Sequence, residues 1–99
     1  MDQTKRIERM EAVLCEGEEL LEKLGEDLNA YSAMLERLQS LENYYGSEEW
    51  HYDYDCDRAG LLPPTLKRGV LSEDAVYDLL ELNDALLRQM EEILSFRDR

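Results

Sequence analysis

The feature that most constrains this chain is a proline-free segment whose apolar residues recur at alternating intervals of three and four. The segment runs from about residue 4 to residue 43. Such a seam occupies one face of an α-helix and is typical of coiled coils and helical bundles. The sequence therefore predicts one long helix over 4–43. The seam consists of Ile7, Met10, Leu14, Gly17, Leu21, Leu24, Leu28, Tyr31, Leu35 and Leu38.

Further apolar residues lie beside the seam and widen it into the stripe that a globular bundle requires. They are Val13, Leu20, Met34 and Leu41. Glutamates remain on the outer face. Gly17 and Gly25 each cost about 1 kcal/mol relative to alanine in a helix. We interpret both as sites of close approach or slight bending, with a break at Gly25 as the less favoured alternative.

A turn and a short helix follow the long segment. Gly46 suits the left-handed residue that ends a helix, and Ser47 offers a capping oxygen to the next one. Two glutamates then complement the positive end of a helix dipole. These signals predict a short helix over 48–59 that ends at Gly60.

The remaining chain predicts a connector over 60–71 and a last helix over 73–96. Pro63-Pro64 favours extended geometry in the connector, and Gly69 is expected to reverse the chain. Ser72 is the expected N-cap of the last helix, with Leu71 packed on Val76. Asn83 interrupts the apolar stripe of this helix, where a polar group is expected to set register.

These elements predict an all-α fold in a single domain, residues 1–99. At 1.5 Å per residue the long helix spans on the order of 60 Å, the last about 35 Å and the middle one about 18 Å. The two shorter helices laid end to end would cover the first. We therefore expect a long antiparallel helical hairpin of three helices. If part of the apolar stripe stays uncovered in the monomer, a homodimer would bury it.

The net charge of −13 on 99 residues restricts the partners of the protein. Such a field repels phosphates and anionic lipid, so we expect no direct nucleic-acid binding and no membrane binding. Cys15 and Cys56 are isolated thiols, which is typical of a reducing compartment. The N-terminus has no signal-peptide pattern and no apolar run is long enough to span a bilayer, so we expect a cytoplasmic protein.

The densest group of aromatic residues lies in the middle of the chain, close to a basic pair. The possible partner-binding residues there are Tyr44, Tyr45, Trp50, Tyr54, Lys67 and Arg68. Trp, Tyr and Arg are enriched in binding hot spots, which favours a recognition patch. The simpler interpretation is that Trp50 and one or two tyrosines close the end of the helical core, while Lys67 and Arg68 pair with local carboxylates.

Metal binding and catalysis have weaker support in the sequence. Asp53, Asp55 and Asp57 begin like a calcium loop, but Arg58 and Pro64 stand where that loop needs Gly and Glu. His51 and Cys56 do not supply a zinc site or a catalytic dyad. We expect no catalytic residue, no metal and no cofactor.

Three ordered motifs resemble a known family. They are RIERME near the start, YYGSEEW in the middle, and LKRGVLSEDAVYDLL leading into the last helix. Over nearly the whole chain the sequence is similar to domain of unknown function family 4298. The resemblance implies a small, acidic, mostly helical bacterial protein. It implies no activity, ligand or catalytic residue.

Two functional hypotheses follow from these features. The first is a non-enzymatic cytoplasmic interaction or adaptor module that binds an as yet unknown protein through the central patch or a helix face. The alternative is an acidic nucleic-acid mimic whose carboxylates occupy a basic DNA-binding protein. A mimic needs a regular double row of carboxylates, whereas an adaptor needs an exposed apolar or aromatic patch.

Overall fold

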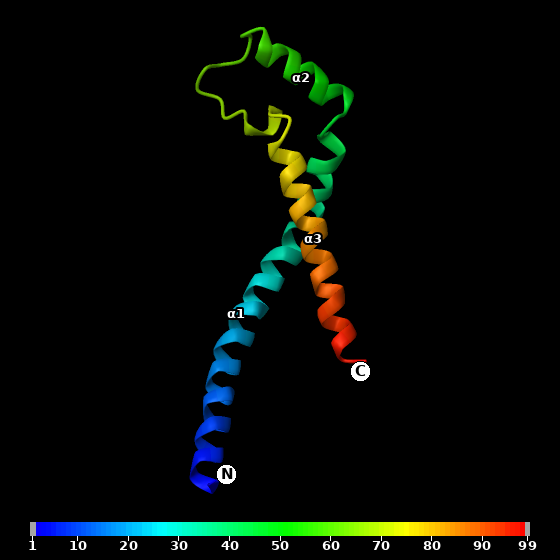
Figure 1. Ribbon diagram of the computed structural model, residues 1–99. Coiled ribbons are helices and arrows are strands. Elements are labelled where there is room, and N and C mark those ends of the chain that lie inside the picture. The colour runs from blue at the N-terminus through cyan, green and yellow to red at the C-terminus, as the bar shows by residue number, and fades with distance from the viewer. Residues whose placement is uncertain (1, 99) are drawn as a thin grey trace. The chain divides into compact units, whose positions relative to one another are not determined.

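The computed structural model describes residues 2–98 and contains three α-helices and one short 3₁₀ turn (Figure 1). Helix α1 spans Gln3–Tyr44, α2 spans Glu48–Arg58 and α3 spans Ala75–Phe96. The 3₁₀ turn η1 spans Gly69–Leu71. No strand occurs within residues 2–98. The all-α prediction is confirmed, and the length of α1 fits a helical hairpin.

The predicted helix boundaries differ from the observed ones by one or two residues. Helix α1 is one residue longer at each end than 4–43, and α2 ends at Arg58, before the predicted 59. Helix α3 begins at Ala75, two residues after the predicted start. The N-cap position of α3 is Asp74, whose side chain makes no capping bond, and not the predicted Ser72. The hydroxyl of Ser72 nevertheless accepts a hydrogen bond from the Ala75 amide, the first of the helix, at 3.1 Å.

The chain divides into two units, and the boundary lies inside α1 between Arg37 and Leu38. The first unit, up to Arg37, is a single continuous helix with no buried residue in its described part. Gly17 and Gly25 do not break it. Among the described residues, a β-carbon at either glycine would meet no atom within 4 Å, so the first unit shows no close approach there.

The second unit, from Leu38 onward, contains the last turns of α1 together with α2, η1 and α3. Its buried side chains are Trp50, Leu71 and Val76. They lie on α2, η1 and the first turn of α3 respectively, and η1 contacts both of these helices. The small core of this unit therefore gathers at the ends of its helices.

Two glycines have the left-handed backbone that the sequence predicted for helix ends. Gly46 has φ 81° after α1, and Gly60 has φ 72° after α2. Residues with a β-carbon rarely adopt this conformation. Gly69 differs from the prediction, because it begins η1 with no positive φ. The connector thus enters α3 through a 3₁₀ turn.

Candidate functional site

The middle of the chain forms an aromatic cluster, which we define as Tyr45, Trp50, His51 and Tyr54. The Tyr54 ring stacks on the indole with centroids 5.2 Å apart and an interplanar angle of 19°. Tyr45 and His51 meet the indole edge to face, at 5.4 and 5.1 Å. Such aromatic pairs contribute about 0.5–1.5 kcal/mol each beyond the area that they bury. The cluster joins the end of α1 to α2.

Trp50 is the centre of this cluster and is only 6% exposed. Its indole Nε1–H donates a hydrogen bond to the Val70 carbonyl at 3.0 Å, which satisfies the one polar group of the side chain. Ser47 positions the tryptophan, because its hydroxyl accepts a hydrogen bond from the Trp50 amide at 3.1 Å and caps α2. The predicted cap at Ser47 is therefore present.

Two tyrosine hydroxyls connect the cluster to the segment that precedes α3. Tyr45 donates to the Glu73 carbonyl at 2.8 Å, and Tyr54 donates to the Glu73 carboxylate at 3.2 Å. Arg58 in turn donates to the Tyr54 hydroxyl at 3.0 Å. These two bonds link residues that lie 28 and 19 positions apart in the sequence and hold them in one arrangement. The contacts fit a structural role for both tyrosines.

Tyr44 lies outside the stacked rings and bonds to the acidic face of α2. Its hydroxyl donates to the Asp53 carboxylate at 2.5 Å. This hydrogen bond, together with burial and the negative charges of Asp53 and Glu49, raises the pKa of Tyr44 from 10.0 to about 12. The phenol therefore stays protonated over the physiological range.

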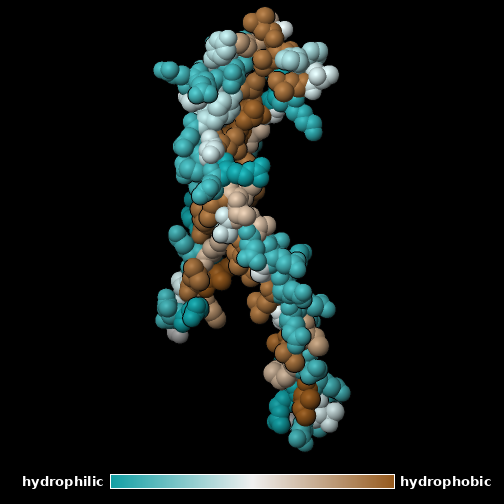
Figure 2. Space-filling model, turned by 180° about the vertical axis from the view of Figure 1, so that it is seen from behind, coloured by the Kyte–Doolittle hydropathy of each residue, from teal (hydrophilic) through white to brown (hydrophobic). Residues whose placement is uncertain are grey.

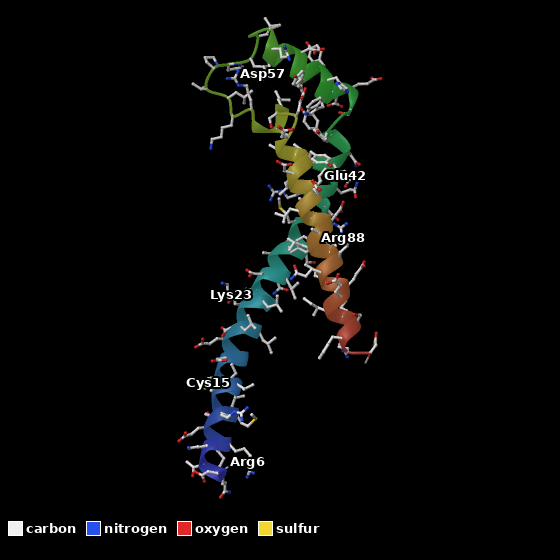
Figure 3. The ribbon with its side chains drawn as sticks, in the orientation of Figure 1. Arg6, Cys15, Lys23, Glu42, Asp57 and Arg88 are labelled. Carbon is white, nitrogen blue, oxygen red and sulfur yellow. The ribbon has the colours of Figure 1, made fainter. Side chains whose placement is uncertain are left out.

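The two basic residues of the connector differ in their surroundings. Arg68 donates at 2.9 Å to the carboxylate of Asp57. Asp57 lies on α2 (Figure 3). Lys67 is exposed. A partly exposed ion pair contributes about 0–1 kcal/mol, so Arg68 holds the connector near α2 only weakly.

The acidic run of α2 does not assemble a cation site. Asp53 and Asp57 are engaged by Tyr44 and Arg68. Among residues 2–98 no group of three or more His, Cys, Asp or Glu side chains converges. Cys56 is half-buried, and its hydrogen bond with Tyr52 raises the pKa of that tyrosine. Cys15 is exposed on α1 (Figure 3).

A second candidate surface is the α1 stripe, the exposed apolar face of the first unit. Leu20 and Leu21 are 65% and 66% exposed. Figure 2 shows apolar side chains reaching the surface along this helix. Ten large apolar side chains between residues 7 and 35 are exposed in total. They are Ile7, Met10, Val13, Leu14, Leu20, Leu21, Leu24, Leu28, Met34 and Leu35.

One shallow hollow of about 280 Å³ lies along α3. Tyr77, Leu80, Glu81 and Asp84 line it, and all four belong to the same helix. Polar groups from different elements do not converge on it.

The structure brings together three of the six residues that the sequence named, namely Tyr45, Trp50 and Tyr54. Tyr44 and Arg68 bond instead to the aspartates of α2, and Lys67 is exposed. Glu73 and Arg58 were missed. A signal for Arg58 was available in the sequence, because it lies four residues after Tyr54 and therefore on the same helix face. No local spacing indicates Glu73, because its partners lie 19 and 28 residues away in the sequence.

None of the helices within residues 2–98 combines the length and the apolar character needed to cross a bilayer. A long apolar-striped helix followed by a tyrosine–tryptophan core and a last helix defines a small all-α protein. The chain belongs to the family described as a domain of unknown function, DUF4298, which it matches over residues 7–93. No curated protein and no solved structure matches it.

Proposed function

We propose that this protein is a non-enzymatic, cytoplasmic interaction module that binds a helical protein partner through the α1 stripe. The observation that carries the proposal is that ten large apolar side chains on one helix are exposed, while the first unit has no buried residue in its described part. Contiguous exposed apolar surface of this extent is typical of protein–protein interaction sites.

The stability of α1 supports the same conclusion. Helices gain most of their stability from packing an apolar face, and helix propensity alone contributes little. The first unit also contains two glycines, each about 1 kcal/mol less favourable than alanine. Burying a leucine or methionine side chain contributes about 1.5–3 kcal/mol, and part of this gain is still available at each exposed position. A partner on the stripe would supply the missing packing.

The spacing of the stripe indicates what shape of partner fits. Seam residues at intervals of three and four follow one line along a helix, and they accept the side chains of a second helix between them. A sheet or an extended peptide would not match that spacing. We therefore propose a partner that presents an amphipathic helix.

The aromatic cluster supports a different role in the same module. Its indole is buried, and its two tyrosine hydroxyls are bonded to Glu73 of the same chain. These contacts favour the interpretation that the cluster closes the core of the second unit. A binding contribution from the connector would rest on Lys67, whose ammonium is exposed.

The alternative hypothesis, an acidic nucleic-acid mimic, has less support. It requires ordered carboxylates, and two aspartates of α2 bond instead to Tyr44 and Arg68. The exposed apolar surface favours the interaction module, because a phosphate mimic binds through carboxylates and does not require exposed leucines.

A differential capture experiment tests the proposal. The tagged full chain and two double variants are incubated with the native cytoplasm, and bound proteins are identified by mass spectrometry. Leu21→Gln with Leu24→Gln changes the stripe, and Ala12→Gln with Ala33→Gln changes the outer face of the same helix. We expect the stripe variant alone to lose its bound proteins, and the loss to recur with the purified partner. Equal recovery by both variants would refute the proposal, and loss with Lys67→Glu would assign the site to the connector.

A further inference from the structure

The stripe on α1 has an internal order that restricts how a second helix can lie on it. Gly17 is the one seam position without a side chain, and it lies between Leu14 and Leu21. The space beside it is open, since a β-carbon there would meet no atom within 4 Å. A helix that packs on this seam must present a large residue opposite Gly17 if the interface is to be filled.

A second copy of α1 satisfies this requirement in only one orientation. In a parallel, in-register pair each seam residue meets its own counterpart, so two glycines would face each other and leave a void. In an antiparallel pair the seam positions alternate, and the counterpart of Gly17 is a leucine. With the pair centred between Leu21 and Leu24, Gly17 lies opposite Leu28 of the other copy.

The residues that flank the seam would form different pairs in the two orientations, with one apolar–acidic pair in each. In antiparallel pairs like flanks meet, whereas in parallel pairs opposite flanks meet. One flank of α1 carries the exposed apolar residues Val13 and Met34, and the other carries Glu11 and Glu18. Antiparallel pairing brings Val13 against Met34 of the other copy. Parallel pairing would set Val13 beside Glu18.

The charged flank residues also select the register. In the centred antiparallel register Glu18 lies between Gly25 and Ser32 of the other copy, and Asp27 lies opposite Leu20. A shift of one heptad in one direction would bring Glu18 opposite Glu18. A shift in the other direction would bring Asp27 opposite Asp27. Like charges directly opposite each other are destabilising, so both shifts are disfavoured.

We propose that two copies of this chain pair through antiparallel α1 stripes, with Leu21 opposite Leu24, Gly17 opposite Leu28 and Leu14 opposite Tyr31. This assignment rests on the proposed function and names the partner helix as α1 of a second copy. The occupant follows from the size match of one stripe to itself, in a register that sets no like charges of the flanks opposite each other.

Disulfide trapping of the full chain tests the orientation and the register. Cys15→Ser and Cys56→Ser remove the natural thiols, and Leu21→Cys and Leu24→Cys are then made as two separate chains. A disulfide requires α-carbons within about 4.4–6.8 Å. We expect efficient cross-linking only when the two chains are mixed. Cross-linking of each chain with itself would indicate parallel pairing and overturn the proposal.

The substitution Gly17→Leu gives an independent readout with opposite signs for the two orientations. In the antiparallel pair the new side chain collides with Leu28, so we expect sedimentation equilibrium to show a dimer weakened at least about tenfold. Adding Leu28→Gly should restore most of the loss. A parallel pair would be strengthened, because the new leucines fill its void. Ala33→Leu on the outer face is the matched control and should leave the dimer unchanged.

The outcomes separate this inference from the proposed function. A monomer at high micromolar concentration, with stripe-dependent binding of a different purified protein, overturns the antiparallel pair and leaves the interaction module standing. A monomer without any stripe-dependent partner overturns both. A mixed Leu21→Cys and Leu24→Cys disulfide together with a dimer weakened by Gly17→Leu supports the inference.

Discussion

Residues 38–98 bury a tryptophan, a leucine and a valine at the ends of their helices, whereas residues 2–37 bury no side chain although their helix is longer and carries ten large apolar side chains. Part of α1 belongs to each unit, so the difference does not come from helix type. It comes from the turn after Tyr44. After that turn, α2 and the start of α3 both contact η1.

The comparison teaches that apolar spacing and burial are separate properties. The seam of α1 has a regular spacing but is uncovered in the first unit. In the second unit a few specific bonds fix the buried groups, such as Trp50 to the Val70 carbonyl and Tyr45 to the Glu73 carbonyl. A regular stripe defines a face that can be buried, and the turns decide whether the same chain buries it.

The largest expected effect comes from removing the centre of the second unit. Trp50→Ala should lower the free energy of unfolding by about 3–5 kcal/mol, because it removes a buried large aromatic side chain. It also leaves the Val70 carbonyl without its donor. Chemical denaturation followed by far-ultraviolet circular dichroism measures the change.

Tyr52→Ala is the matched control for this substitution, since Tyr52 is an aromatic residue of the same helix with 70% exposure. We expect it to change stability by less than about 0.5 kcal/mol. A Trp50→Ala protein as stable as the Tyr52→Ala protein would contradict the role of the indole as the centre of the core.

Much of the local structure was predictable from the sequence, and the tertiary contacts were not. The cap at Ser47, the hydrogen bond of the Ser72 hydroxyl and the left-handed Gly46 follow from short-range chemistry, in which the side chain and its partner lie within three residues. The acceptor of the Trp50 indole lies 20 residues away in an irregular connector. No periodicity indicates which carbonyl of a connector will face a helix.

The same limit applies to the candidate site. The sequence grouped six residues because they are near in the chain and similar in kind. The structure separates them by their partners. The indole stacks on Tyr54 and meets Tyr45 edge to face. Tyr44 and Arg68 bond to aspartates, and Lys67 is exposed. The interpretation of Trp50 as the plug of a core needed only its place in a capped helix.

A smaller effect should come from the cap that positions the tryptophan. Ser47→Ala removes the acceptor of the Trp50 amide and the donor to the Tyr44 carbonyl. We expect a loss of about 1 kcal/mol, as for other N-cap substitutions. Ser32→Ala inside α1 is the control and should be neutral within about 0.5 kcal/mol. Equal denaturation midpoints for the two variants would show that the cap does not support the second unit.

The Tyr44 hydroxyl should make the stability of the second unit depend on pH. Its pKa is raised from 10.0 to about 12, so its stabilising contribution is fully present below pH 10 and is lost as the pH rises towards 12. Tyr44→Phe should cost about 0.5–1 kcal/mol at neutral pH, and the cost should vanish at the alkaline end. Absorbance titration of the phenolates should lose its highest transition in the variant. A cost that persists unchanged at alkaline pH would assign it to packing.

The connector should respond weakly, and its two basic residues form a matched pair. Arg68→Glu sets a second negative charge beside Asp57 and should cost up to about 1 kcal/mol, with a smaller cost in high salt. Lys67→Glu should stay within about 0.5 kcal/mol of the natural chain. Thermal unfolding at two salt concentrations measures both. A larger loss from Lys67→Glu than from Arg68→Glu would contradict the contacts described for the connector.

The smallest expected effect is that of Leu21→Ala. It is the sharpest test of the comparison, because the same substitution can be made at Leu71 in the second unit. Leu71 is 5% exposed and Leu21 is 66% exposed. Leu71→Ala should cost about 2–5 kcal/mol, since it opens a cavity in the second unit. Leu21→Ala removes no contact that this unit makes, and we expect a change below about 0.5 kcal/mol when the chain is monomeric. Fluorescence of the single tryptophan reports unfolding of the second unit in both variants.

At higher protein concentration the Leu21→Ala cost should grow, because a partner that binds only the folded helix adds stability by mass action. A cost at Leu21 that equals the cost at Leu71 and does not depend on concentration would mean that the stripe is packed within its own chain, and the difference between the two regions would disappear.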